Sequence, residues 1–148
     1  MKFEDYAPEG NRFVKEVAME LGTPEDTDHA YRVMKALFQT MRDILSPEES
    51  LHFISQLPMP VKAVYVDGWK LKPRERIRTM NEFLECLRAK SDRSAGRDFG
   101  DDETAKGHAK AVLNVVKRHI ATGEVQHMID QFPMELTELW LSDEKVIH

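Results

Sequence analysis

The strongest constraint on the fold of this chain is an internal repeat. Residues 27–66 align with residues 102–141 at a shift of 75 without a gap, and nine of the forty positions are identical. The identical pairs are Ala30/Ala105, Lys35/Lys110, Ala36/Ala111, Glu49/Glu124, His52/His127, Ile54/Ile129, Gln56/Gln131, Pro58/Pro133 and Met59/Met134. A shorter match relates residues 11–17 to residues 81–87 at a shift of 70. Such a repeat predicts a fold built from two copies of one structural unit.

Apolar residues recur at helical spacing in both halves. An apolar stripe over residues 13–21 ends before Gly22, a residue typical of the position that follows a helix. We expect a second, long helix to begin at Thr23, with Pro24 in its first turn, and to run to about residue 45.

Two further helix starts have the capping-box pattern, in which glutamate follows a hydroxyl residue by three positions. The pattern occurs at Ser46–Glu49 and again at Thr79–Glu82. Residues 91–101 are polar and contain two glycines, and we expect them to form an exposed connection.

These patterns predict an all-α fold, because no segment has the alternating apolar pattern of strands. We expect a single compact domain over residues 1–148 with about eight helices. It would comprise two tandem four-helix repeats, residues 11–66 and 79–141, joined by a connector at residues 67–78. We expect the repeats to pack about a pseudo-twofold axis.

The composition is that of a soluble protein, with 41% hydrophobic and 32% charged residues. No apolar run approaches the length of about 18 residues that a membrane span needs, so we expect no membrane segment. Cys86 is the only cysteine, which excludes an internal disulfide and favours a cytoplasmic protein with a packed thiol. The net charge is −5, but residues 70–97 hold nine Lys and Arg against four Asp and Glu.

The repeat duplicates a Glu-x-x-His pattern, and this pattern is the candidate metal site. Glu49 and His52 form the first pair, and Glu124 and His127 form the second. Residues three apart on a helix share a face, so each pair offers a carboxylate and an imidazole to one ion. A simpler interpretation is that each glutamate lies in the first turn of a helix, where an acid is stabilising without a metal.

The basic connector is the second candidate site. Alternating basic residues over 70–78 beside two aromatic side chains predict either a weak nucleic-acid contact or a structural connector that pairs with an acidic body. Because the rest of the chain is acidic, we do not expect nucleic-acid binding. The candidate partner-binding residues are Tyr65, Trp69, Arg74, Arg76 and Arg78.

No other chemistry stands out. The histidines His29, His108, His119 and His148 have no common spacing. The chain has no zinc-protease, nucleophile-elbow, phosphate-loop or dinucleotide motif, and we expect neither catalytic residues nor a cofactor.

Three segments carry a family resemblance: residues 57–69 (LPMPVKAVYVDGW), residues 131–140 (QFPMELTELW) and residues 82–84 (EFL). Together with the repeat, they make the chain similar to the bacterial domain of unknown function numbered 2267, from about residue 11 to residue 141. The resemblance implies a bacterial, all-helical protein with duplicated halves, and it implies no reaction.

The sequence therefore favours a non-enzymatic interaction or regulatory module in the cytosol. Its partner would be another protein or a second copy of the chain. The alternatives are a metal-binding bundle that uses the doubled Glu-x-x-His and a weak nucleic-acid contact through residues 70–78.

Overall fold

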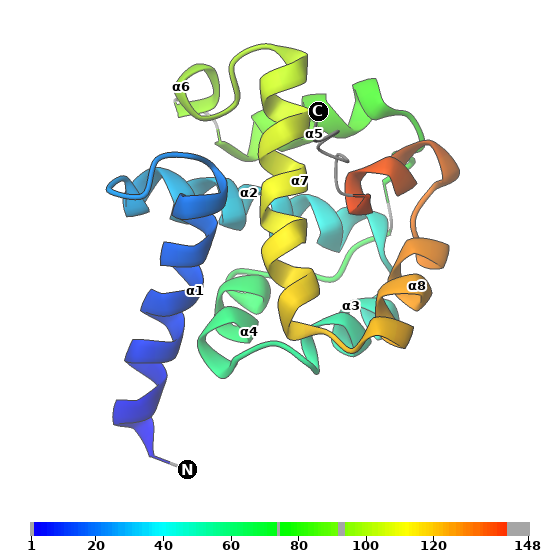
Figure 1. Ribbon diagram of the computed structural model, residues 1–148. Coiled ribbons are helices and arrows are strands. Elements are labelled where there is room, and N and C mark those ends of the chain that lie inside the picture. The colour runs from blue at the N-terminus through cyan, green and yellow to red at the C-terminus, as the bar shows by residue number, and fades with distance from the viewer. Residues whose placement is uncertain (1, 74, 92–93, 142–148) are drawn as a thin grey trace, which may run out of the picture.

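The computed structural model describes residues 2–73, 75–91 and 94–141, and within these residues the fold is all-α, without strands. This confirms the predicted fold class. The elements are η1 (Phe3–Asp5), α1 (Tyr6–Glu20), α2 (Thr27–Ile44), α3 (Pro47–Ile54), α4 (Met59–Val66), α5 (Met80–Ser91), α6 (Ala95–Phe99), α7 (Asp102–His119), α8 (Thr122–Gln131) and η3 (Met134–Trp140) (Figure 1).

Helices α2 and α7 are the two long central helices, and an aspartate caps each of them. The Asp26 side chain accepts a hydrogen bond from His29 N at 3.0 Å, and the Asp101 side chain accepts one from Thr104 N at 2.8 Å. The bounds of α7 are those of α2 shifted by 75 residues. The predicted start at Thr23 was wrong, because residues 23–26 form a turn and the cap at Asp26 begins the helix.

The other predicted starts agree with the structure. Ser46 and Glu49 form a reciprocal capping box at α3. Thr79 and Glu82 exchange the equivalent bonds at α5, with Thr79 N to Glu82 Oε1 at 3.1 Å and Glu82 N to Thr79 Oγ1 at 3.1 Å. Gly22 follows α1 with φ of +83°, a conformation that glycine adopts without strain.

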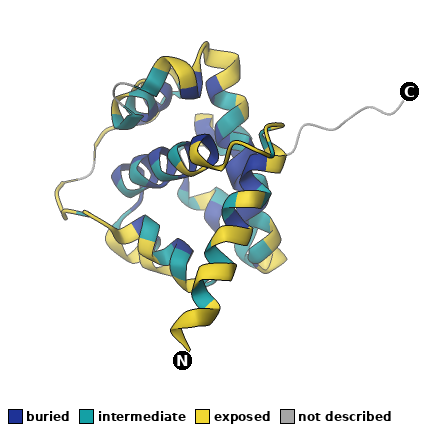
Figure 2. Cartoon of the chain, turned by 90° about the vertical axis from the view of Figure 1, so that its left-hand side faces the viewer, coloured by how far each residue is buried: buried dark blue, intermediate teal, exposed yellow. Residues whose placement is uncertain are grey.

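The first helix of each half packs against both central helices. Helix α1 lies against α2 and α7, and α5 lies against the same two helices at the other end of the molecule. Helix α4 packs on α1 and α2, while η3 packs on α5 and α7. The buried side chains lie on the inward faces (Figure 2) and form one cluster. Its largest fully buried members include Phe13, Phe38, Phe53, Tyr65, Phe83, Phe99 and Trp140.

The segment 91–101 differs from the prediction of an exposed connection. Its residues 95–99 form the short helix α6, which packs against α2, α5 and α7. Asp98 and Phe99 on this helix are fully buried. Phe99 supplies the apolar anchor that a purely solvated loop would not have, and its contact with the core brings Asp98 inside with it.

Among the described residues, no helix has both the length and the apolar character to cross a lipid bilayer.

Candidate functional site

Three of the four residues of the doubled Glu-x-x-His come together where α3 and α8 meet. His52 Nε2 donates to Glu124 Oε2 at 2.5 Å. The rings of His52 and His127 lie edge to face, with centroids 4.9 Å apart. Glu49 has another role, because its carboxylate accepts from Ser46 N at 2.8 Å in the capping box.

The Nε2 atoms of both histidines in this cluster have hydrogen-bond partners. His52 Nε2 must carry the proton that it donates to Glu124, because a carboxylate only accepts. His127 Nε2 accepts from the Gln131 amide at 3.0 Å. The cluster is also open to solvent, with the His52 side chain 43% exposed. Within residues 2–73, 75–91 and 94–141, no group of three or more His, Cys, Asp and Glu is arranged to hold a metal ion.

The basic connector borders an open groove. This groove has a volume of about 850 Å³ and is lined by the segment Glu75–Arg78, the segment Gln131–Glu135 and Ile44. Ile77 and Phe132 supply buried apolar surface in the lining, and Met134 is almost fully exposed. Of the connector's described residues, 70–73, 75, 76 and 78 are exposed, whereas Ile77 is buried.

The charged residues in the groove lining are two acids, Glu75 and Glu135, and two arginines, Arg76 and Arg78. Arg76 and Arg78 are exposed, and neither guanidinium forms an ion pair with a described residue. Glu75 lies 3.4 Å from Lys72 Nζ, and Glu135 accepts from Met80 N at 2.9 Å. Both acids therefore have a partner. Hydrogen bonds from Thr79 lower the pKa of the Glu82 carboxyl, and Arg78 lies near enough to Glu82 to help lower it. Arg74, the third candidate arginine, lies outside the described residues.

The two candidate aromatic residues have different environments. Tyr65 is fully buried, and its hydroxyl shares a 2.7 Å hydrogen bond with Ser50. Burial raises the pKa of Tyr65, although the bond to Ser50 opposes this shift. The ring therefore belongs to the core and does not reach a partner at the surface. Trp69 is half-buried and lies edge-on to Tyr65, with ring centroids 5.9 Å apart.

Cys86 is half-buried on α5, with its sulfur 3.7 Å from an Asp43 carboxylate oxygen. Burial raises the pKa of the Cys86 thiol. A raised pKa keeps the group protonated at neutral pH, which does not suit a nucleophile.

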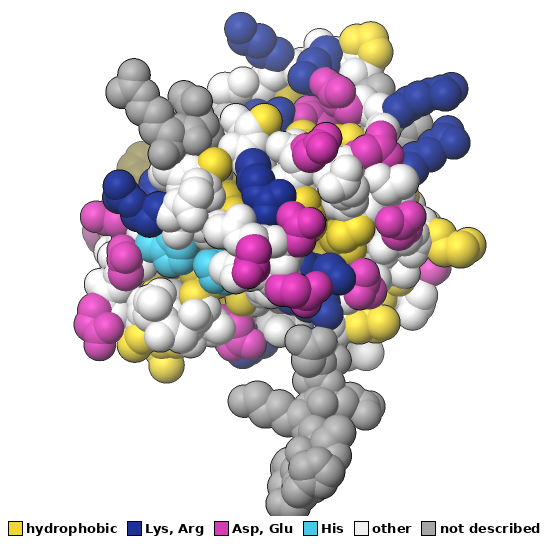
Figure 3. All heavy atoms as spheres, turned by 90° about the horizontal axis from the view of Figure 1, so that it is seen from above, with side chains coloured by type: hydrophobic (Ala, Val, Ile, Leu, Met, Phe, Trp, Pro, Cys, Tyr) yellow, Lys and Arg dark blue, Asp and Glu magenta, His cyan; other side chains and the backbone are white. Residues whose placement is uncertain are grey.

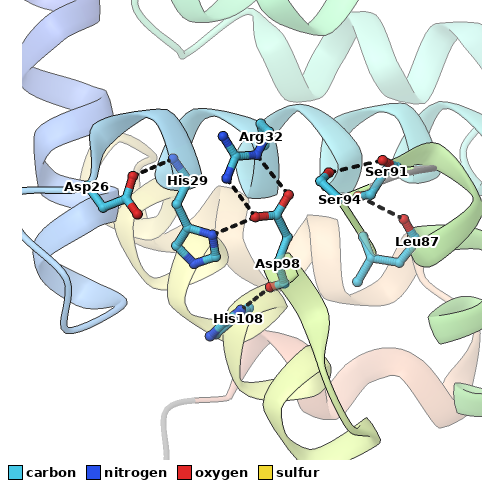
Figure 4. A network of polar contacts seen from close by, with 8 residues as sticks. All are labelled: Asp26, His29, Arg32, Leu87, Ser91, Ser94, Asp98 and His108. Atoms are coloured by element: carbon cyan, nitrogen blue, oxygen red, sulfur yellow. Dashed lines mark hydrogen bonds and ion pairs between the residues drawn. The ribbon is translucent and has the colours of Figure 1, made fainter. Parts of the chain in front are cut away.

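A buried polar network around Asp98 was not predicted from the sequence (Figure 4). Its carboxylate accepts from His29 Nδ1 at 2.8 Å, from Arg32 Nε at 2.9 Å and from Arg32 Nη2 at 3.0 Å. The carbonyl oxygen of Asp98 accepts from His108 Nδ1 at 2.7 Å. Helix α6 thereby joins α2 to α7 through a single residue.

The electrostatics of the network follow from these bonds. Burial by itself raises the pKa of Asp98, but hydrogen bonds from Arg32, His29 and Ser94 outweigh it and hold the pKa at about 2. Burial lowers the pKa of His108, against the effect of its bond to the Asp98 carbonyl. Asp98 is therefore ionised at neutral pH, and the neutral form of His108 is favoured.

One face of the molecule shows how its charges are distributed. In Figure 3, Lys and Arg side chains are interspersed with Asp and Glu, and histidine side chains reach the same face. Such a mixed face offers no continuous positive field to a nucleic-acid backbone.

The comparison with known families now adds to this geometry. The model of an uncharacterized conserved protein family, DUF2267, matches residues 10–139. The chain belongs to the DUF2267 family. No curated protein matches it. The DUF2267 description names no activity, so the roles of the candidate residues in this DUF2267 chain are argued from their geometry.

Proposed function

We propose that this protein is a non-enzymatic binding module that takes an acidic segment of a partner protein in the groove beside residues 75–78. The observation that carries the proposal is the pair of exposed arginines, Arg76 and Arg78, beside the buried apolar side chains of Ile77 and Phe132; neither guanidinium forms an ion pair with a described residue. Guanidinium groups bind carboxylates through two parallel hydrogen bonds, which gives both energy and orientation.

The apolar lining supplies the second element of recognition. Met134 is 89% exposed, and it lies beside the buried side chains of Ile77 and Phe132. An apolar side chain that covers this surface gains about 25 cal/mol for each Å² removed from water. The fitting ligand is therefore a peptide that alternates acidic and large apolar residues.

A peptide-binding experiment tests this function. The probe is a fluorescein-labelled synthetic peptide of alternating glutamate and leucine, titrated with the full chain and followed by fluorescence anisotropy. We expect saturable binding that weakens as salt is raised, and at least about tenfold weaker binding for the variant R76E/R78E. A peptide of alternating lysine and leucine is the control ligand.

The matched control variant is Arg97→Glu, which reverses one exposed arginine on α6. It should bind the acidic peptide as the wild type does. Equal affinity for the acidic and basic peptides, or no loss in R76E/R78E, contradicts the proposal. A change in oligomeric state of R76E/R78E on size-exclusion chromatography would instead assign the groove to a second copy of the chain.

We also propose that the fold is a tandem duplication of residues 11–66 and 79–141 about a pseudo-twofold axis between α2 and α7. Two hydrogen bonds from a side chain to a backbone carbonyl support it. Arg42 Nη1 donates to Tyr65 O at 3.1 Å, and Lys117 Nζ donates to Trp140 O at 2.7 Å. Both members of the second pair lie 75 residues after those of the first. In a crystal structure, residues 27–66 should superpose on residues 102–141 by a rotation near a half turn, and a clearly different rotation contradicts the symmetry.

We further propose that this is a bacterial protein of the cytoplasm, because its single half-buried Cys86 forms no internal disulfide. Recovery of the native protein from the periplasmic rather than the cytoplasmic fraction of bacterial cells contradicts this location.

A further inference from the structure

His29 and His108 come from opposite halves of the chain and meet beside Asp98. Their ring centroids are 5.4 Å apart, and the ring planes are inclined by 74°. Figure 4 shows both rings held by Asp98, one through its carboxylate and the other through its backbone carbonyl. The His29 side chain is only 11% exposed, so its position is set by packing as well as by its bond.

The acceptors determine which ring nitrogen carries the proton. A carboxylate and a carbonyl oxygen only accept, so the Nδ1 atoms of His29 and His108 must both donate. In a neutral imidazole, a proton on Nδ1 leaves a lone pair on Nε2. Among the described residues, neither Nε2 atom takes part in a hydrogen bond.

This arrangement is the one that proteins use to prepare histidines for metal binding. A metal-ligating histidine generally donates its other ring N–H to a carboxylate or a backbone carbonyl, which fixes the tautomer and the ring orientation. The spacing also fits: two imidazoles on one tetrahedral ion, with metal–nitrogen bonds of about 2.1 Å, have centroids about 5 Å apart.

We propose that His29 and His108 bind one divalent transition-metal ion of the zinc class through their Nε2 atoms, with Asp98 orienting both rings. Imidazole nitrogens select Zn²⁺, Ni²⁺ or Cu²⁺ over Mg²⁺ and Ca²⁺, which prefer oxygen ligands. Two protein ligands leave further coordination positions for water or for an exogenous ligand, so the site is an open one.

The doubled Glu-x-x-His offers a direct contrast. There, Nε2 of His52 donates to Glu124, and Nε2 of His127 accepts from Gln131. Those two Nε2 atoms would have to give up existing hydrogen bonds before binding an ion. The Nε2 atoms of the unrepeated pair, His29 and His108, carry no such bond among the described residues.

A zinc titration of the untagged full chain tests the assignment, in competition with a chromophoric zinc chelator. The decisive variant is His108→Gln, because a glutamine amide can still donate to the Asp98 carbonyl but offers no imidazole. We expect its zinc affinity to fall by at least about tenfold. His119→Gln, on the same helix α7, and H52A/H127A are the matched controls and should bind zinc as the wild type does.

A spectroscopic measurement on the wild type keeps the test independent of the stability of any variant. In long-range ¹H–¹⁵N spectra of the imidazoles, zinc should shift the Nε2 signals of His29 and His108, and Mg²⁺ should not. The proposal is overturned if zinc leaves those two signals unchanged, if His108→Gln binds zinc as tightly as the wild type, or if affinity is lost in H52A/H127A instead.

Discussion

Helix α1 packs against α7 and helix α5 packs against α2, and the ion pairs at these two contacts have opposite polarity. At the first contact, Glu20 lies 2.7 Å from Arg118. At the second, Lys90 lies 2.6 Å from Asp43. Position 90 is position 20 shifted by 70, and position 118 is position 43 shifted by 75. Under the proposed repeat these positions correspond, so the acid and the base are exchanged between the two contacts.

The exchange of acid and base between the two contacts bears on which helices can pair there. If α1 packed against a copy of α2 at this contact, Glu20 would face Asp43, and if α5 packed against a copy of α7, Lys90 would face Arg118. Both arrangements bring like charges together, which costs free energy. Under the proposed repeat, the charges would favour the pairing of a first half with a second half over the pairing of two identical halves.

The two contacts also differ in burial, and this difference sets their energies. The Asp43 side chain is 8% exposed and lies near Cys86 as well as Lys90. The Arg118 side chain is 51% exposed. Solvent screens the second pair much more than the first, so equal substitutions should have unequal effects.

Asp43→Arg should have the largest effect, because it places an arginine, the residue type at position 118, next to Lys90 in a buried contact. Two positive charges then meet where an ion pair was. We expect the free energy of unfolding to fall by about 3 kcal/mol. Lys90→Glu should restore part of this loss by making the pair complementary again. Urea unfolding of the two single variants and the double variant measures both effects, and a double variant that is less stable than D43R contradicts the comparison.

Low pH should weaken the hydrogen bonds of Asp98 on helix α6. Helix α6 precedes α7, whereas a turn without a helix precedes α2. The pKa of Asp98 is about 2 in the folded state, below its ordinary 3.8. The ionised carboxylate therefore adds about 2 kcal/mol of stability above about pH 4, which is lost as the pH falls through about 2.

The variant D98N lacks this contribution. The difference in unfolding free energy between wild type and D98N should shrink as the pH is lowered from about 5 to about 2. Urea titrations at both pH values measure it. A constant difference across that range shows that the carboxylate charge does not stabilise the fold.

Ser50→Ala should reveal a third difference between the halves. Ser50 bonds the buried hydroxyl of Tyr65, whereas the equivalent of Ser50 is Val125, and Trp140 Nε1 has no partner in the described structure. Removing the Ser50 hydroxyl leaves that of Tyr65 unpaired and should cost about 1.5 kcal/mol. The double variant S50A/Y65F removes both hydroxyls and should recover most of the loss in a thermal or urea melt. No recovery would mean that the cost lies in packing.

Arg118→Asp should have the smallest effect, although it is the counterpart of Asp43→Arg. Because the pair with Glu20 is exposed, we expect a loss of about 0.5 kcal/mol that declines as salt is raised. Glu20→Lys should reverse it. A loss as large as that of D43R would show that burial does not separate the two contacts.

The helices themselves could be predicted because their signals are local. The capping boxes at Ser46 and Thr79 and the glycine after α1 act within one turn of the chain, and each is present in the structure. The start of α2 was misplaced because Thr23 and Asp26 both offer a cap within four residues. Only the side-chain bond from Asp26 to His29 N decides between them.

The candidate sites were predicted less well, because they depend on residues far apart in the chain. The duplicated histidines were found from their spacing, but that spacing could not show that Glu49 stays in its own capping box. His29 and His108 have no common spacing, so the sequence did not predict that their rings meet. The one local signal was Phe99, an aromatic residue in a polar segment that marks a point of burial next to Asp98.

The amino-acid sequence by itself determined the helix class, most helix ends and the apolar faces, because periodicity and caps are properties of neighbouring residues. The tertiary structure alone decided that Asp98 joins His29 to His108, that Arg76 and Arg78 border a groove, and that opposite charges meet at the two helix contacts. Those outcomes depend on how the helices pack, and packing brings together residues such as His29 and Asp98 that lie 69 positions apart.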